Sequence, residues 1–241
     1  MKHYFKRFFS DKYAKREAIG ANLLLLLMYR FSYPFASILS SMGFSPNQIT
    51  TMSLFTSLVA ATLLVFDDGW ILFLVFWGGA LLLDFCDGTV ARKTNKIRNT
   101  AFRYDHTSDL LKFFLIILAV GIKYSDSIVW ILCLAASFSF MFYMVVNHDL
   151  KTARDRIHVS SNKITKSPKN KKLYESASIS SWAKISKAIY AIFMTVHGHT
   201  LLIFLVFPFG INWAISALIY LMSISLYRSA IAIYLLTKIP K

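Results

Sequence analysis

The chain has 241 residues, of which 56% are hydrophobic and only 16% charged, and its net charge is +15. Charged residues make up about a quarter of an ordinary soluble domain, so the composition excludes that class. The basic charge does not indicate nucleic-acid binding, because Lys and Arg gather beside apolar stretches, where they would contact anionic lipid headgroups. We therefore expect an all-α integral membrane protein with membrane lipids, and no nucleic acid, as partners.

The N-terminal segment, residues 1–46, is expected to be cytosolic. It is basic and lacks the apolar core and cleavage site of a secretory signal. Within it, residues 12–41 combine a basic start, an apolar middle, Arg30 and Pro34. A membrane span here would place the N-terminus outside and break the positive-inside rule. We predict an interfacial amphipathic helix kinked near Pro34, with a seventh span as the alternative.

Residues 47–238 are predicted to form a six-helix transmembrane domain, because a bilayer-crossing helix needs about 20 apolar residues. The expected spans are 47–66, 69–91, 103–123, 127–148, 188–208 and 211–236. Cys86 and Cys133 both fall inside spans and give no disulfide signal. Two connections are longer and polar: 92–102, and a flexible basic loop at 149–187.

The distribution of Lys and Arg predicts the orientation. The short hairpin ends carry a single basic residue, Lys123, whereas the termini and both long connections carry most of the others. Because cytosolic loops are enriched in Lys and Arg, we expect both termini and both long connections in the cytosol. We expect a multi-pass protein of a bacterial inner membrane.

Four acidic residues interrupt the apolar sequence at Asp84, Asp87, Asp105 and Asp109. The first two are three residues apart and the last two are four apart, and either spacing places a pair on one helix face. The connection at 92–102 is short, so the two helices are expected to be antiparallel neighbours whose cytosolic ends bring the four carboxylates together. Acidic groups in a membrane are costly and mark functional sites.

Grouped carboxylates require a counter-charge, because like charges and a low dielectric both disfavour ionisation. Mg²⁺ and Mn²⁺ prefer carboxylate oxygens and often lie beside phosphates, and two ions about 4 Å apart can clamp a phosphorus under attack. Arg92 and Arg98 suit a diphosphate, while Gly88 and Ala91 leave room for a nucleotide. The structural alternative is simple pairing of an acid with a lysine such as Lys112.

The segment DFCDGTVAR at 84–92, followed by YDHTSD at 104–109, resembles the signature of the CDP-alcohol phosphotransferases. That signature reads D-x-x-D-G-x-x-A-R, about eight residues, G, then x-x-x-D-x-x-x-D. The spacing matches throughout, but Ala101 stands where the later glycine is usual, and its methyl group could narrow the cleft. SPNQIT at 45–50 is similar to the family's Pro-Asn-x-x-Thr start of the first span.

The resemblance implies transfer of a substituted phosphate group from a CDP-linked donor to the hydroxyl of an alcohol acceptor, releasing CMP, in phospholipid biosynthesis. Asp109 would be the general base. Two Mg²⁺ or Mn²⁺ ions would be held by Asp84, Asp87, Asp105 and Asp109. The CDP moiety would be bound by Asn47, Thr50, Gly88, Ala91, Arg92 and Arg98. The resemblance also implies a cytosolic active site and suggests a homodimer.

Polar residues in other spans are candidates for binding the acceptor: His148, His197, His199 and Arg228. For His148, near the cytosolic boundary, a plain interfacial role is the simpler interpretation. His197 and His199 would point about 200° apart on a helix and would not share a metal, so structural hydrogen bonds are an equal alternative. Arg228 is the strongest candidate for a charged acceptor or a lipid phosphate.

Two directions of transfer remain open. CDP-diacylglycerol could donate a phosphatidyl group to a small polar alcohol, which the short chain favours by analogy, or a CDP-linked head group could pass to a lipid or polyprenyl acceptor. Outside the family, an aspartate-rich prenyltransferase would need a second aspartate-rich motif. A cation transporter would not need Gly88, Ala91 and Arg92 at fixed spacing, and no inverted repeat is evident.

Overall fold

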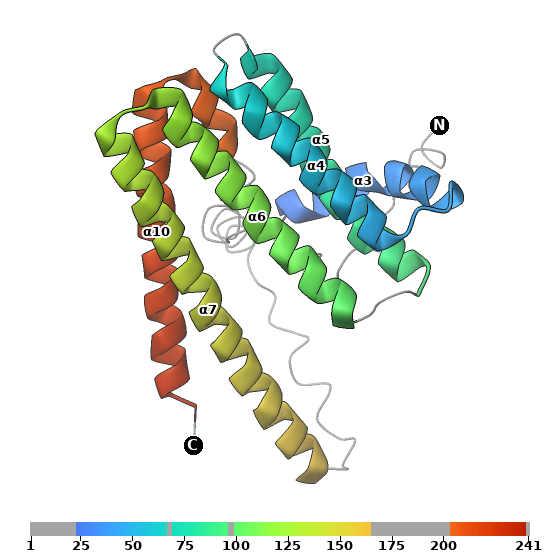
Figure 1. The fold of residues 1–241 in the computed structure, drawn as a ribbon. Helices are drawn as coiled ribbons and strands as arrows, with labels where there is room; N and C mark the ends of the chain where they lie inside the picture. The colour runs from blue at the N-terminus through green and yellow to red at the C-terminus, as the bar shows by residue number, and fades with distance from the viewer. Residues whose placement is uncertain (1–22, 67–68, 96–98, 165–202, 240–241) are drawn as a thin grey trace, which may run out of the picture.

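The computed structural model describes residues 23–66, 69–95, 99–164 and 203–239. These residues contain helices and no strand, as expected from the sequence (Figure 1). In chain order the elements are α3 (Leu23–Ser41), α4 (Pro46–Val65), α5 (Trp70–Lys93), α6 (Asn99–Tyr124), α7 (Ser127–Ile164), the 3-10 helix η2 (Phe204–Phe209) and α10 (Ile211–Thr237).

Four of these elements are long and apolar enough to cross a membrane, namely α4, α5, residues Ser127–Ala153 of α7, and α10. They coincide with four of the predicted spans, and the chain is accordingly an integral membrane protein. Helix α6 covers the predicted span 103–123, but its charged residues interrupt the apolar sequence, so this span remains a prediction. Of the predicted span 188–208, the structure describes residues 203–208 alone.

A capping box fixes the start of α4. The Ser45 hydroxyl accepts a hydrogen bond from the Gln48 N–H at 3.4 Å, and the Gln48 side chain accepts one from the Ser45 N–H at 2.9 Å. Pro46 follows as the first helical residue, where its missing N–H costs nothing. The preceding turn from α3 passes through Gly43 at φ +84°, a conformation that favours glycine.

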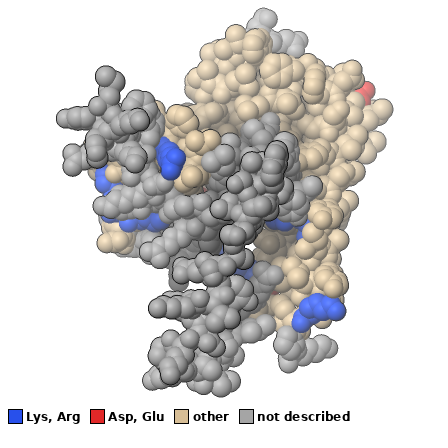
Figure 2. All heavy atoms as spheres, turned by 180° about the vertical axis from the view of Figure 1, so that it is seen from behind, with Lys and Arg blue, Asp and Glu red and all other residues tan. Residues whose placement is uncertain are grey.

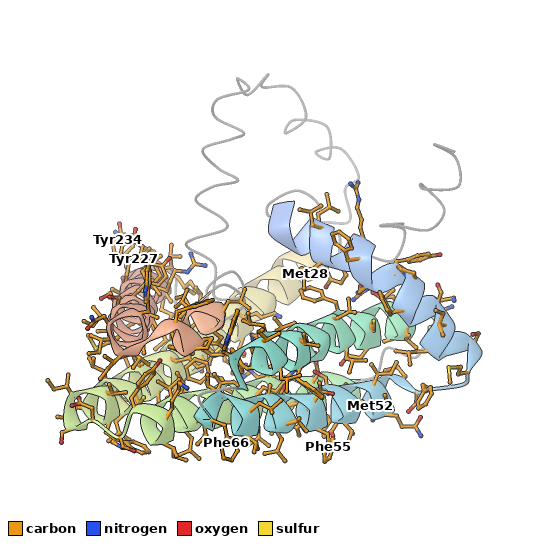
Figure 3. The ribbon with its side chains drawn as sticks, turned by 90° about the horizontal axis from the view of Figure 1, so that it is seen from above. Met28, Met52, Phe55, Phe66, Tyr227 and Tyr234 are labelled. Atoms are coloured by element: carbon orange, nitrogen blue, oxygen red, sulfur yellow. The ribbon has the colours of Figure 1, made fainter. Side chains whose placement is uncertain are left out.

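The helices form two neighbouring groups (Figure 1). Helix α4 packs against α5 and α6, α10 packs against α7, and α6 also contacts α7. Aromatic residues pack at the interface between the two groups of helices. There the rings of Phe113 in α6 and Phe140 in α7 stack with centroids 4.0 Å apart. Apolar side chains also cover the outside, as Figure 3 shows for Phe55 of α4 and for Phe66 directly after it. Such exposed apolar surface suits contact with lipid.

Helix α3 crosses the α4–α5 pair instead of running parallel to it, and it packs against α5 (Figures 1 and 3). It continues as one helix through Pro34. Its outer side exposes Phe31, Phe35 and Ile38. This arrangement agrees with a helix lying in the membrane interface, although that location remains a prediction. The first part of the predicted helix, residues 12–22, lies outside the described residues.

Helix α7 is longer than the sequence led us to expect. It continues to Ile164, so residues 149–164, predicted as the start of a flexible loop, are helical and that boundary was wrong. The segment has no glycine or proline to stop the helix. The change from apolar to polar sequence therefore does not mark the end of the helix. The rest of the predicted loop lies outside the described residues.

Charged side chains are distributed unevenly on the described surface. Figure 2 shows an upper part of this face that is uncharged apart from an acidic side chain at its edge, with Lys and Arg at mid-height and below. In Figure 1 the end of α5 and the start of α6 lie near mid-height, above the ends of α7 and α10. The orientation that the sequence predicts from its Lys and Arg distribution remains a prediction.

Candidate active site

Three carboxyl groups converge between α5 and α6. One carboxylate oxygen from each of Asp84, Asp105 and Asp109 lies within 4.8 Å of the other two. Each of the three residues is partly exposed. Oxygen ligands at this separation could hold a hard divalent cation. The predicted meeting of the two helix ends is therefore confirmed for these three aspartates.

Asp87 has a different environment. It is 5% exposed and does not belong to the group of three. The hydroxyl of Thr50, in the first turn of α4, donates a hydrogen bond to Asp87 Oδ2 at 2.5 Å. Asp87 still lies close enough for its charge to interact with those of Asp84 and Asp105. Three of the four carboxylates predicted to gather therefore do so. The fourth, Asp87, lies beside them and is hydrogen-bonded to Thr50 of α4.

Lys112 of α6 lies among these acids and is 5% exposed. Its ammonium group forms ion pairs with Asp84 and, at 2.8 Å, with Asp109. It also donates to the Ser53 hydroxyl of α4 at 3.4 Å. The sequence offered a lysine pair as the alternative to a metal site. The structure shows that pair, on two of the three carboxylates that could also hold an ion.

Arg92 folds back over its own helix. Its guanidinium carbon lies 5.2 Å from the centre of the Tyr29 ring of α3, and that ring packs edge-on against Phe85 at 5.0 Å. A Cβ atom added to Gly88 would lie 3.2 Å from Nη1 of Arg92. Gly88 therefore leaves room for the arginine of its own chain, and its contact with a nucleotide remains a prediction. Burial raises the pKa of Tyr29 above its usual value, while Arg92 acts to lower it.

The remaining predicted site residues are dispersed. Asn47 is exposed at the start of α4, and Ala91 is half-buried near the end of α5. His148 is exposed on α7 and close enough to His106 of α6 for their charges to interact. Arg228 is half-buried on α10. Outside the described residues lie Arg98, His197 and His199.

A comparison with protein-family models matches residues 44–227 to the family described as CDP-alcohol phosphatidyltransferase. The chain belongs to the CDP-alcohol phosphatidyltransferase family. The match covers well over half of the sequence and confirms the resemblance, so a transferase acting on a CDP-linked donor is supported. A comparison with curated proteins finds no match.

Two residues beside the site fall outside the segments that resemble the family's signature. Lys112 had a sequence signal, because it is a charge in an apolar stretch, three residues after Asp109 and therefore on the same face. No feature of the sequence indicated Tyr29, since only tertiary packing brings α3 against Arg92. Helix α3 thus contributes directly to the surroundings of Arg92.

Proposed function

We propose that this chain transfers a phosphatidyl group from CDP-diacylglycerol to the hydroxyl of a small polar alcohol, releasing CMP, in phospholipid biosynthesis. The observation that carries the proposal is the convergence of Asp84, Asp105 and Asp109 beside Asp87 and Arg92. Membership of the family supports the CDP-linked donor. The proposed domain is a six-helix transmembrane unit over residues 47–238, preceded by the N-terminal segment 1–46.

The acidic donor set fits a divalent cation with hard, oxygen-preferring chemistry. Mg²⁺ and Mn²⁺ both take carboxylate oxygens, and three lie within 4.8 Å of one another here. Asp84, Asp105 and Asp109 would hold one ion, and Asp87 would contribute to a second. When bound, the ions would neutralise the diphosphate and polarise the phosphorus under attack.

Asp109 is the proposed general base. Its side chain is 39% exposed, against 26% for Asp84, so an acceptor hydroxyl can approach it more readily. In the proposed reaction its carboxylate takes the hydroxyl proton as the oxygen attacks the β-phosphorus. The bond between the β-phosphorus and the bridging oxygen breaks, CMP leaves with the electron pair, and a phosphodiester forms.

Arg92 is proposed to receive the donor's diphosphate. A guanidinium can donate two parallel hydrogen bonds to phosphate oxygens, which positions as well as attracts the group. Contact with Tyr29 restricts the arginine before the donor arrives, so less freedom is lost on binding. Positioning and fixed charge of this kind supply much of the rate enhancement in phosphoryl transfer.

The site is proposed to open to the cytosol. The cluster lies where α5 ends and α6 begins. The last turn of α5 carries Arg92 and Lys93, and the connection to α6 carries Lys96 and Arg98. Basic connections favour the cytosolic side, where soluble acceptors and cations are available. A homodimer in a bacterial inner membrane completes the proposal.

A substrate panel tests this function. Purified protein in nanodiscs containing CDP-diacylglycerol would receive Mg²⁺ and, in turn, glycerol 3-phosphate, serine or inositol, with CMP as the readout. A second arm would offer CDP-linked polar alcohols with diacylglycerol or a polyprenyl phosphate. We expect CMP in the first arm. CMP in the second arm alone would reverse the direction of transfer, and no CMP in either arm would contradict the proposed reaction.

A further inference from the structure

Three helices enclose the ammonium group of the Lys112 side chain. From α6 it pairs with Asp84 of α5 and with Asp109 of its own helix, the latter at 2.8 Å. It donates to the Ser53 hydroxyl of α4 at 3.4 Å, and that hydroxyl donates in turn to the Ala80 carbonyl oxygen at 2.7 Å. The three donors of an ammonium group can thus all be used by these partners.

The burial of Lys112 means that its pairing is a requirement of the fold. A residue only 5% exposed would carry an uncompensated charge without its carboxylate partners, which is strongly unfavourable. The carboxylates have the same requirement, because Asp84 and Asp109 lie close enough for their charges to repel. The lysine and the two aspartates therefore stabilise one another when no other cation is present.

The same two carboxylates belong to the group that could hold a divalent ion. An ion bound by Asp84 and Asp109 would approach the Lys112 ammonium, and the two positive charges would repel. We propose that Lys112 is an internal counter-ion that holds Asp84 and Asp109 together before the divalent cation binds, and that it competes with this cation for them. This inference rests on the metal site of the proposed function.

The proposal makes Lys112 a positioning residue with two opposing effects. Without metal, its charge holds α5 and α6 together at the cluster. With metal, the same charge weakens cation binding. A lysine with a merely structural role would have the first effect only, because its removal would loosen the ligands and leave cation binding unchanged or weaker.

Lys112→Met, which removes the charge but keeps an unbranched chain, tests the proposal. Lys123→Met is the matched control, the same change at the far end of the same helix. We expect Lys112→Met to lower the unfolding temperature in EDTA, with Mn²⁺ reversing the loss, and to tighten Mn²⁺ binding in electron paramagnetic resonance titrations by about tenfold or more. Lys123→Met, whose ammonium lies over the Tyr124 ring and away from the cluster, should leave Mn²⁺ affinity unchanged.

If Lys112→Met does not fold, Lys112→Gln provides the same Mn²⁺ titration, because it removes the charge and keeps a hydrogen-bond donor. Mn²⁺ affinity that is unchanged or weaker in the uncharged variant would overturn the inference while leaving the metal site intact. A wild-type protein that binds no Mn²⁺ would instead contradict the proposed metal site, and the inference with it.

Discussion

The Thr50 hydroxyl donates to Asp87 Oδ2 across 2.5 Å and so ties the first turn of α4 to the acidic end of α5. Thr50 is 3% exposed and Asp87 is 5% exposed, so the bond is shielded from water. The capping box at Ser45 sets the register of α4 and with it the position of this hydroxyl. A sequence feature at the start of one helix thereby orients a carboxylate on the next.

We expect Thr50→Val to reduce CMP release by roughly tenfold or more, because a hydrogen bond to a charged group contributes about 1.5–3 kcal/mol. The neighbouring change Thr51→Val is the control, since the Thr51 hydroxyl is exposed and contacts Tyr104 instead of an acid. Initial rates at several Mg²⁺ concentrations would measure both. Equal rates in the two variants would show that Asp87 needs no orientation by α4.

The contact between Arg92 and Tyr29 predicts a split between binding and turnover. Tyr29→Leu removes the ring, and a cation–π contact contributes about 0.5–2 kcal/mol, so KM for the CDP-linked donor should rise several-fold with little change in kcat. Tyr29→Phe keeps the ring and should stay near wild type. Phe35→Leu, an exposed aromatic on the same helix, is the control. A fall in kcat alone would argue against this role.

Gly88 and Arg92 should behave as a coupled pair. Gly88→Ala places a Cβ atom 3.2 Å from the guanidinium and should displace it, weakening donor binding. The same change in an Arg92→Ala background should cost much less, because the group that it displaces is gone. Donor KM for the four proteins of this double-mutant cycle measures the coupling. Independent effects would mean that Gly88 acts on the nucleotide directly, as the sequence alone suggested.

Gly121 offers a test of packing away from the chemistry. A Cβ atom there would lie 2.7 Å from the Trp130 ring, across the contact between α6 and α7, so Gly121→Ala should lower the unfolding temperature. Gly78→Ala is the matched control, because a Cβ atom at Gly78 meets nothing and alanine favours helix. The rate per folded molecule should be unchanged in both. A stable Gly121→Ala protein would contradict the tight packing.

The sequence predicts what depends on spacing and hydropathy. The i,i+3 and i,i+4 spacings indicated correctly that aspartates of α5 and α6 would converge, because spacing fixes the face of a helix. They could not show that Asp87 lies outside the group of three and accepts a hydrogen bond from Thr50, since side-chain partners come from other helices. Nor could they show that the Arg92 guanidinium lies over Gly88, because a side-chain rotamer is not encoded in the spacing. The predicted end of α7 was wrong because the helix was expected to stop where the sequence becomes polar. No glycine or proline is present there, and the helix continues.

The most direct test of the central claim is the rate of CMP release by Asp109→Asn in nanodiscs containing Mg²⁺, CDP-diacylglycerol and the acceptor found by the panel. Asp126→Asn, at a hairpin end where the carboxylate caps α7, is the control for the loss of an acid. We predict that Asp109→Asn loses about 10²–10⁴-fold in rate, the usual contribution of a general base, while still binding nucleotide. Release at the wild-type rate would contradict the account, because the proton would then have another acceptor.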